Sequence, residues 1–293
     1  MCLTSKDGAV IEVISYNSVR LRRWLPEAKE LRYCLFMAFF YLDDSKHHKF
    51  GFSLAAFAVC DVDPTDELSA IYSRFGYDPE AFEFKSSAKM KDDVNLQKLR
   101  GALKSYIQRN CKIAVCIVEG DKKLGPAALH LLQSAISHPR YADDDHHIFF
   151  DEGLFQSSKA AENLTADFKK LGQCAFNFEQ DSQQVMGIQL ADIVAHTCSI
   201  MLLEALGHIN KMIVVNAPGD TIYHGLEVEL GFEMWADIRY AFLSQGKTNP
   251  KDDFDLANVE VYPWGLFIDD SVGKHIASIA MDRFGENYLG CIH

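Results

Sequence analysis

Short apolar runs alternate with helix-forming segments along this chain, and that alternation restricts the fold more than any other feature. Aromatic and β-branched runs are typical of strands, and amphipathic segments between them are typical of covering helices. The expected strands are Leu35–Leu42, Gly51–Cys60, Phe82–Lys85, Lys112–Val118, His147–Asp151 and Cys174–Phe178. The expected helices are Asp66–Phe75, Asp93–Arg109, Pro126–Ser137, Ser157–Leu171 and Gln184–Leu206. This order predicts an α/β fold in which helices flank a mixed β-sheet.

The alternating pattern divides the 293 residues into three regions. Residues 34–209 carry the pattern and are expected to form the main domain. Residues 1–33 are expected to be a helical or extended lead-in. Residues 210–293 are expected to form a mainly helical C-terminal extension packed on the same domain, with helices at Glu229–Leu243 and Ile276–Phe284.

The sequence predicts a cytoplasmic protein without a membrane span. The most apolar runs, Cys34–Leu42 and Phe52–Cys60, are about half as long as the 18–20 residues that a span requires. Acidic residues interrupt the arginine-rich stretch before the first run, so it does not match an export signal. The eight cysteines include no Cys-x-x-Cys pair, and all are expected to be reduced thiols without zinc.

The net charge of −12 argues against a general polyanion-binding surface. One segment departs from it, because Lys85–Lys112 holds eight basic side chains and only two acidic ones. On the expected helix within it, Leu96, Leu99 and Leu103 share one face, and Lys98 and Arg109 lie opposite. The segment is either a solvated helix face or a local contact for the phosphates of a nucleic acid.

Paired acids follow two of the expected strands. Asp43 and Asp44 come directly after FMAFFYL, and Asp151 and Glu152 come directly after HIFF. In α/β proteins the C-terminal edge of the sheet is where ligands bind. The alternative is that both strands simply end in polar loop residues.

Asp192 lies inside the apolar helical sequence GIQLADIVAHTCSIMLL. Helical spacing places it on one polar stripe with Gln189, His196 and Ser199. An unpaired buried carboxylate costs roughly several kcal/mol, so Asp192 needs a base, hydrogen-bond donors or a metal ion as partner. A hydrogen bond from His196, one turn away, is one candidate, and backbone or arginine donors are another.

Carboxylates that converge from two strand ends and a late helix would bind one or two Mg²⁺ or Mn²⁺ ions. Two such ions about 3.5–4 Å apart activate a water and stabilise the leaving oxygen in phosphodiester hydrolysis. Glu83 and Lys85, in EFKSS, could add a further ligand and a cation that faces a phosphate. A Glu and a Lys two positions apart on a strand also simply share a face.

Four motifs carry a resemblance to a known family. They are YLDDS (Tyr41–Ser45), EFKSS (Glu83–Ser87), IFFDE (Ile148–Glu152) and DSQQVMGIQLADIVA (Asp181–Ala195). In this order they resemble the domain-of-unknown-function 3800 family, which belongs to the ribonuclease H-like group. The match covers about residues 36–205, and the last motif is the most specific.

The resemblance implies a ribonuclease H-like sheet with an acidic cluster of Asp43, Asp151 and Asp192. Asp44 stands at the position of a family Glu, and Ser45 at that of a family Ser. Gln189 and Ser182 match positions near the cluster and are expected to support it through hydrogen bonds.

These observations predict a metal-dependent nuclease that uses Mg²⁺ or Mn²⁺. Asp43, Asp151 and Asp192 are its expected ligands, Asp44, Glu83 or Glu152 would complete the shell, and Lys85 would stabilise the phosphate. The main alternative is a non-catalytic ribonuclease H-like module that binds nucleic acid or protein. A third hypothesis, a restriction-endonuclease-like site, combines Glu83 and Lys85 with Asp61 or Asp63 but leaves Asp192 unexplained. The sequence predicts neither the oligomeric state nor the choice among DNA, RNA and a smaller substrate.

Overall fold

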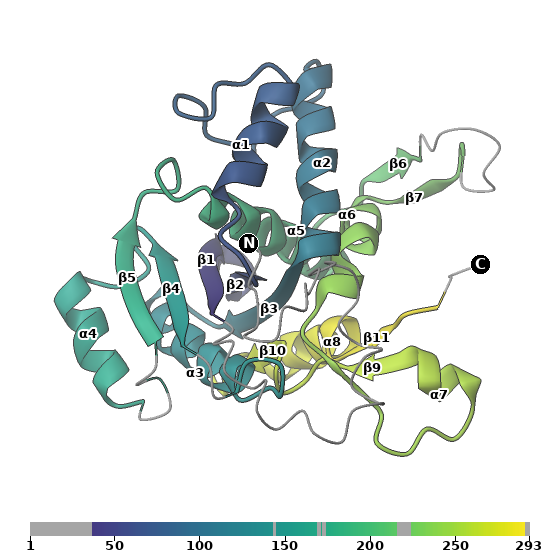
Figure 1. Ribbon diagram of the computed structural model, residues 1–293. Coiled ribbons are helices and arrows are strands. Elements are labelled where there is room, and N and C mark those ends of the chain that lie inside the picture. The colour runs from purple at the N-terminus through teal and green to yellow at the C-terminus, as the bar shows by residue number, and fades with distance from the viewer. Residues whose placement is uncertain (1–36, 143–144, 169–170, 172–173, 216–223, 291–293) are drawn as a thin grey trace, which may run out of the picture. The chain divides into compact units, whose positions relative to one another are not determined.

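A mixed sheet of six strands forms the centre of the structure, which is a computed structural model (Figure 1). Its strands are β1 (Ala38–His47), β2 (Phe52–Cys60), β3 (Cys111–Val118), β4 (His146–Asp151), β5 (Cys174–Gln180) and β10 (Leu266–Ile268), in the spatial order β10-β3-β2-β1-β4-β5. β2 is antiparallel to β1 and β3, whereas β4 is parallel to β1 and β5 is parallel to β4. The expected α/β fold is confirmed.

The structure describes residues 37–142, 145–168, 171, 174–215 and 224–290. They belong to one compact unit, residues 36–293, so the expected main domain and C-terminal extension are described together. The expected lead-in, residues 1–33, lies outside the described residues.

Helices cover both faces of the sheet. On one face α5 (Gly187–Ala205) packs against β1 and β2, and α1 (Thr65–Arg74) and α2 (Val94–Asn110) lie side by side above it in the view of Figure 1. On the other face lie α3 (Leu124–Ile136) and α4 (Ser158–Ala166). Because side chains alternate along a strand, β1 sends Tyr41 into the core under α5 and Phe40 and Leu42 into the core under α3.

Most expected elements are present within a few residues of their expected bounds. Asp93 begins α2 as expected, because its side chain accepts a hydrogen bond from the Leu96 N–H at 2.9 Å. The expected helix Ser157–Leu171 is shorter and ends at Ala166. The expected strand Phe82–Lys85 is wrong, since this segment is irregular and the Phe84 N–H donates to a side chain instead of a ladder.

The C-terminal region contains strands that the sequence did not predict. Its helices are α6 (Leu230–Ile238), α7 (Asp253–Ala257) and α8 (Lys274–Phe284), and 3-10 turns occur at Arg239–Ala241 here and earlier at His48–Phe50 and Asp121–Lys123. Its short strands are β6 (Met212–Val214), β7 (Glu227–Glu229), β8 (Gln245–Gly246), β9 (Asn258–Glu260) and β11 (Glu286–Tyr288). Since β10 pairs with β3, the region contributes a strand to the central sheet and packs on the same domain.

Among the described residues α5 is the one helix long and apolar enough to cross a bilayer. In the structure 72% of its apolar window is buried, and the helix packs on β1 and β2. Its apolar composition is therefore explained by its place in the core.

α5 approaches β1 closely because it begins with Gly187. A Cβ atom at Gly187 would lie 2.5 Å from the Tyr41 ring. That ring is buried and stacks on Phe149 with a centroid distance of 5.1 Å, so it has little room to move. The glycine therefore sets the distance between the helix that carries Asp192 and the strand that carries Asp43.

We predict that Gly187→Ala lowers the free energy of unfolding by about 1–3 kcal/mol, because the methyl group overpacks the contact with Tyr41. Gly101→Ala is the matched control, since Gly101 is exposed on α2 and an added Cβ would meet nothing within 4 Å. That change should stabilise the protein by about 0.5–1 kcal/mol. Urea denaturation measures both variants, and equal effects would contradict this account of the contact.

Candidate functional site

Asp43 and Asp151 lie next to each other on the face of the sheet that α5 covers. Leu42 and Phe150 are register partners on the parallel strands β1 and β4, and each aspartate follows directly. Tyr41 and Phe149, two residues earlier, stack on that same face. Strand alternation returns the chain to this face at Asp43 and Asp151, so their carboxylates leave adjacent strands in the same direction.

The two carboxylates act on each other through charge and a hydrogen bond. Burial raises the pKa of Asp43 to about 8, with further increases from the negative charges of Asp151 and Asp192. Burial also raises the pKa of Asp151, against the effect of a hydrogen bond with Asp43. Asp43 therefore keeps its proton at neutral pH and shares it with Asp151.

Asp192 completes the acidic group from α5. One carboxylate oxygen accepts a hydrogen bond of 2.7 Å from the Ser86 N–H. Burial raises the pKa of Asp192, while hydrogen bonds from Ser86 and the charge of Lys85 act in the opposite direction. Ser86, which the sequence reasoning did not single out, thus supplies the partner that the buried aspartate required.

The irregular segment between α1 and α2 brings Glu83 and Lys85 to the same region. The Lys85 ammonium lies 2.5 Å from a Glu83 carboxylate oxygen and 3.2 Å from the Ser182 hydroxyl oxygen, and that hydroxyl donates a hydrogen bond to Glu83. Burial lowers the pKa of Lys85, but Glu83, Asp151 and Asp43 together raise it above its ordinary value. Lys85 is thus a charged, half-exposed side chain that faces the acidic group.

Gln189 holds this segment against α5. Its side-chain oxygen accepts hydrogen bonds from the Tyr72 hydroxyl at 2.5 Å and from the Phe84 N–H at 2.8 Å. Its side-chain nitrogen donates to the Ser182 carbonyl at 2.7 Å. The buried amide therefore joins α1, the Glu83–Ser86 segment and the turn before α5, and it keeps Ser86 beside Asp192.

Asp44 points away from the group, to the other face of the sheet. It forms an ion pair of 3.1 Å with Lys46, and its pKa, raised by burial, is also raised by nearby Asp121. The prediction that Asp44 joins Asp43 in one shell is therefore not supported by its position. Because β1 continues to His47, strand alternation separates the two neighbours.

The remaining predicted residues lie at the margin of the group formed by Asp43, Asp151 and Asp192. Glu152 is exposed directly after β4, and the Ser45 hydroxyl lies 2.9 Å from a ring nitrogen of His47. His196 is half-buried on α5, and this burial and then the charge of Arg100 lower its pKa. Its electrostatic neighbours in the structure are thus Arg100 and His47.

The restriction-endonuclease-like hypothesis needs Asp61 or Asp63 as an additional ligand beside Glu83 and Lys85. Asp61 forms an ion pair of 2.5 Å with Arg140, and Asp63 accepts hydrogen bonds from Thr65 at the start of α1. Both carboxylates are thus engaged outside the group formed by Glu83 and Lys85.

The sequence reasoning missed Glu179 at the tip of β5. Its φ of 52° is the one positive value at a non-glycine residue within the described ranges. One carboxylate oxygen accepts a hydrogen bond of 3.1 Å from the Gly153 N–H, and the other is buried without a hydrogen-bond partner among the described residues. Glu179, whose backbone is strained, therefore places a carboxylate at a third strand tip, near the end of β4. The only signal in the sequence was the polar continuation EQD after the run AFNF.

The donor set suits a hard divalent cation in chemistry but is not assembled as a finished cage. Three half-buried carboxylates form an excess of negative charge, in which the charges of Asp151 and Asp192 add to the effect of burial on the pKa of Asp43, and Mg²⁺ and Mn²⁺ prefer such oxygen ligands. Within the part of the chain that the structure describes, however, no group of three or more His, Cys, Asp or Glu side chains is positioned to hold a metal ion. A bound cation would have to draw the side chains together.

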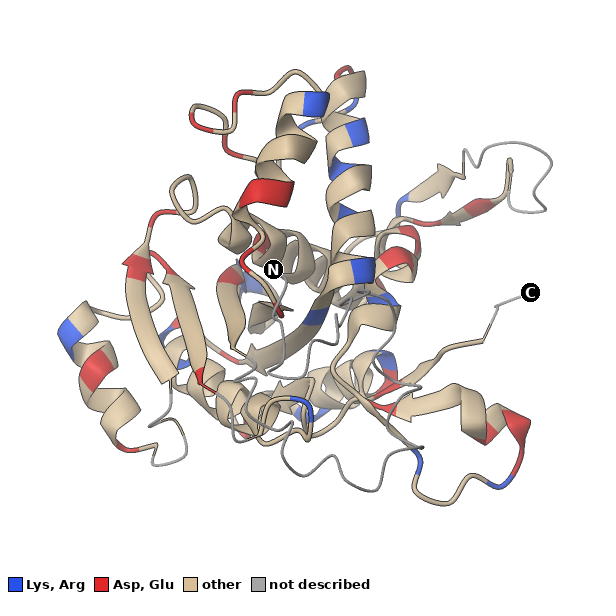
Figure 2. Ribbon diagram, in the orientation of Figure 1, with Lys and Arg blue, Asp and Glu red and all other residues tan. Residues whose placement is uncertain are grey.

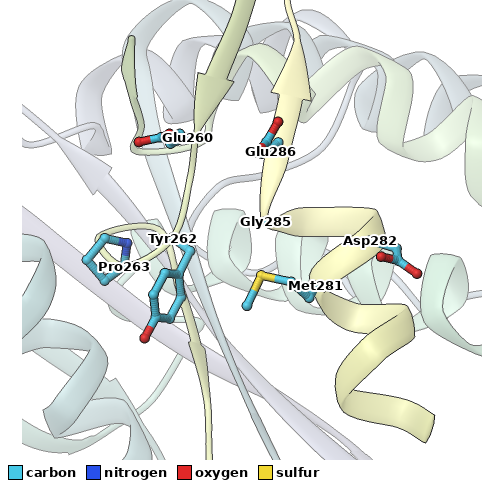
Figure 3. A pocket seen from close by; sticks show the side chains of 7 residues that line it. All are labelled: Glu260, Tyr262, Pro263, Met281, Asp282, Gly285 and Glu286. Carbon is cyan, nitrogen blue, oxygen red and sulfur yellow. The ribbon is translucent and has the colours of Figure 1, made fainter. Parts of the chain in front are cut away.

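Two concave regions of the surface lie elsewhere. A pocket of about 660 Å³ beside β9, α8 and β11 is lined by acidic side chains, Tyr262 and Met281 (Figure 3). A second, of about 380 Å³, lies at the end of α2 and the start of β3. Neither is lined by any of the three aspartates.

Comparison with known proteins adds no assignment. No protein-family model matches the chain, and no curated protein matches it significantly. The resemblance to the domain-of-unknown-function 3800 family therefore rests on the four motifs alone.

We predict that Asp43→Asn flattens the dependence of stability on pH. The pKa of Asp43 rises from its ordinary 3.8 to about 8 on folding, so the folded state holds the proton and loses stability as pH increases from about 4 to 8. The substitution should raise the free energy of unfolding by about 1–3 kcal/mol at pH 8 and by little at pH 4. Urea denaturation across this range, with exposed Asp282→Asn as control, measures the effect. The same slope in wild type and Asp43→Asn would contradict the coupling.

We predict that Gln189→Leu destabilises the protein by about 2–4 kcal/mol, since it leaves the Tyr72 hydroxyl, the Phe84 N–H and the Ser182 carbonyl without their shared partner. Exposed Gln108→Leu, at the end of α2, should change stability by less than about 0.5 kcal/mol. Chemical denaturation compares the two variants. A small effect at Gln189 would show that the amide does not hold the Glu83–Ser86 segment.

Proposed function

We propose that this protein is a metal-dependent phosphodiesterase of the ribonuclease H-like type that cleaves nucleic acid with Mg²⁺ or Mn²⁺. One observation carries the proposal. Three half-buried aspartates from β1, β4 and α5 lie close enough together for the charges of Asp151 and Asp192 to add to the burial that raises the pKa of Asp43 to about 8. Such a concentration of partly desolvated carboxylates is costly unless a cation neutralises it.

The arrangement of the sheet supports the proposal. The antiparallel strands β1, β2 and β3 continue into parallel β4 and β5, and helices lie on both faces. This is the kind of mixed sheet that the four motifs imply. Fold alone does not define an activity, so the proposal depends on the acidic group rather than on the sheet.

Asp43, Asp151 and Asp192 would hold the metal ion, and Asp44 is left out because it faces the other side of the sheet. A bound Mg²⁺ or Mn²⁺ would supply an activated water and stabilise the leaving oxygen. Lys85 would bind a substrate phosphate, and Glu83 and Ser182 would hold its ammonium in place. The Ser86 N–H would keep the Asp192 carboxylate oriented.

The exposed side of α2 is the proposed contact for the nucleic-acid backbone. Basic residues follow the helix in Figure 2, and Lys91, Lys98 and Arg109 are exposed. Lys104 does not belong to this surface, because it is buried and forms ion pairs with Glu233 at 3.6 Å and Asp237 at 2.6 Å. The contact would therefore be narrower than the whole Lys85–Lys112 segment. We place the activity in the cytoplasm.

A second candidate function is a non-catalytic module that binds nucleic acid or protein through the same fold. The lack of a preformed metal-holding group among the described residues favours it. In that case the aspartates would be structural, and Asp43 would keep its proton at neutral pH.

The proposed activity predicts that Mn²⁺-dependent cleavage of single-stranded, double-stranded and hybrid oligonucleotides falls by at least about 100-fold in Asp192→Asn. Asp282→Asn, which changes an exposed side chain on α8, should cleave at the wild-type rate. Cleavage that survives intact in Asp192→Asn would sink the assignment of this residue. Absence of Mn²⁺ binding by calorimetry at millimolar metal would favour the non-catalytic module.

A further inference from the structure

Two cysteines face each other across neighbouring strands at the end of the sheet remote from Asp43. Cys60 ends β2, Cys111 begins β3, and they are direct register partners on antiparallel strands. Their sulfur atoms are 3.4 Å apart. Directly opposed residues of antiparallel strands have Cα atoms about 4.5–5.5 Å apart, within the range of roughly 4.4–6.8 Å found in disulfides.

Both thiols are almost completely buried, and Cys111 borders a surface pocket. Cys60 and Cys111 are 1% and 6% exposed. Cys111 also lines the pocket of about 380 Å³ at the end of α2, whose charged lining residues are Asp61, Glu67, Arg109, Lys112 and Arg140. This pocket is the side from which a small disulfide reagent such as oxidised glutathione would approach Cys111, and the mixed charges of its lining select neither an anionic nor a cationic reagent.

We propose that Cys60 and Cys111 form an intramolecular disulfide when a low-molecular-weight disulfide oxidises them. The Cys111 thiolate attacks one sulfur of the oxidant, which forms a mixed disulfide and releases the first oxidant thiolate. The Cys60 sulfur then attacks Cys111, the mixed disulfide breaks, and a second oxidant thiolate leaves. Two protein thiols lose two electrons and two protons, and one oxidant disulfide becomes two thiols.

The reaction will be slow at neutral pH and faster at higher pH. The hydrogen bond with Cys60 and burial raise the pKa of the Cys111 thiol, and the negative charges of Asp61 and Glu67 raise it further, so its thiolate is scarce. The pair is thus expected to be reduced in a reducing cytoplasm and to be oxidised under sustained oxidising conditions.

The disulfide would close a covalent loop that contains the segment between the two cysteines. Residues 61–110, between the two cysteines, form α1, the Glu83–Ser86 segment and α2. Both ends of this loop would be tied to one point at the base of the sheet, which restricts its opening. The inference does not rest on the proposed nuclease activity, since it concerns the opposite end of β2 and β3.

Peptide mapping of the full-length protein tests the proposal. The folded protein is equilibrated at pH 8 with excess oxidised glutathione, alkylated and digested without reductant. We expect the peptide that holds Cys60 to be joined to the peptide that holds Cys111, with a mass about 2 Da below the sum of the two reduced peptides. Cys116→Ala, which changes another buried cysteine of β3, should give the same cross-link.

Oxidation should also raise the Tm of the wild type by roughly 5 °C or more and slow the proteolysis of residues 61–110. Cys111→Ala should show neither change after the same treatment. Both thiols alkylated at equilibrium, a stable mixed disulfide with glutathione, or a cross-link to a different cysteine would each overturn the proposal.

Discussion

The crowding of three half-buried carboxylates is the constraint on which the rest of the site depends. Asp43 and Asp151 leave adjacent strands side by side, and Asp192 approaches from α5, so each loses part of its hydration and the charges of Asp151 and Asp192 act on Asp43. The structure limits the repulsion in two ways. Asp43 keeps a proton, and the Ser86 N–H and Lys85 stabilise the charge of Asp192 and Asp151.

The irregular segment before α2 has its own role in this balance. It brings no ladder of hydrogen bonds to the sheet, and its position depends on the buried amide of Gln189. Through that contact the segment delivers one backbone donor and one ammonium to the acidic group. Gly187 sets the distance between α5 and β1, because it lets α5 lie close to Tyr41. Gly187 and Gln189, both on α5, thus fix the position of Asp192 relative to β1 and to the Glu83–Ser86 segment.

Much of this could be predicted from the sequence, and the failures have identifiable causes. The alternation of apolar runs predicted the sheet, and the helical spacing around Asp192 predicted one polar stripe, on which Gln189 is buried and Asp192 is half-buried. Asp44 was expected in one shell with Asp43 because β1 was expected to end at Leu42. It continues to His47 by pairing with β2, so the alternation continues through both aspartates. Phe82–Lys85 was taken for a strand because its local composition is strand-like, whereas its hydrogen-bond partner lies 105 residues further along the chain. Neither that partner nor the short β10, which adds to the sheet from residue 266 onwards, leaves a local signal.

The central claim is that a divalent cation draws Asp43, Asp151 and Asp192 together. The most direct measurement is the anomalous diffraction of crystals soaked in millimolar Mn²⁺. The account predicts a single strong peak, or two peaks about 3.5–4 Å apart, bounded by oxygens of these three side chains at roughly 2.0–2.3 Å. A map without a peak between β1, β4 and α5, or with manganese bound only at other carboxylates, would contradict it.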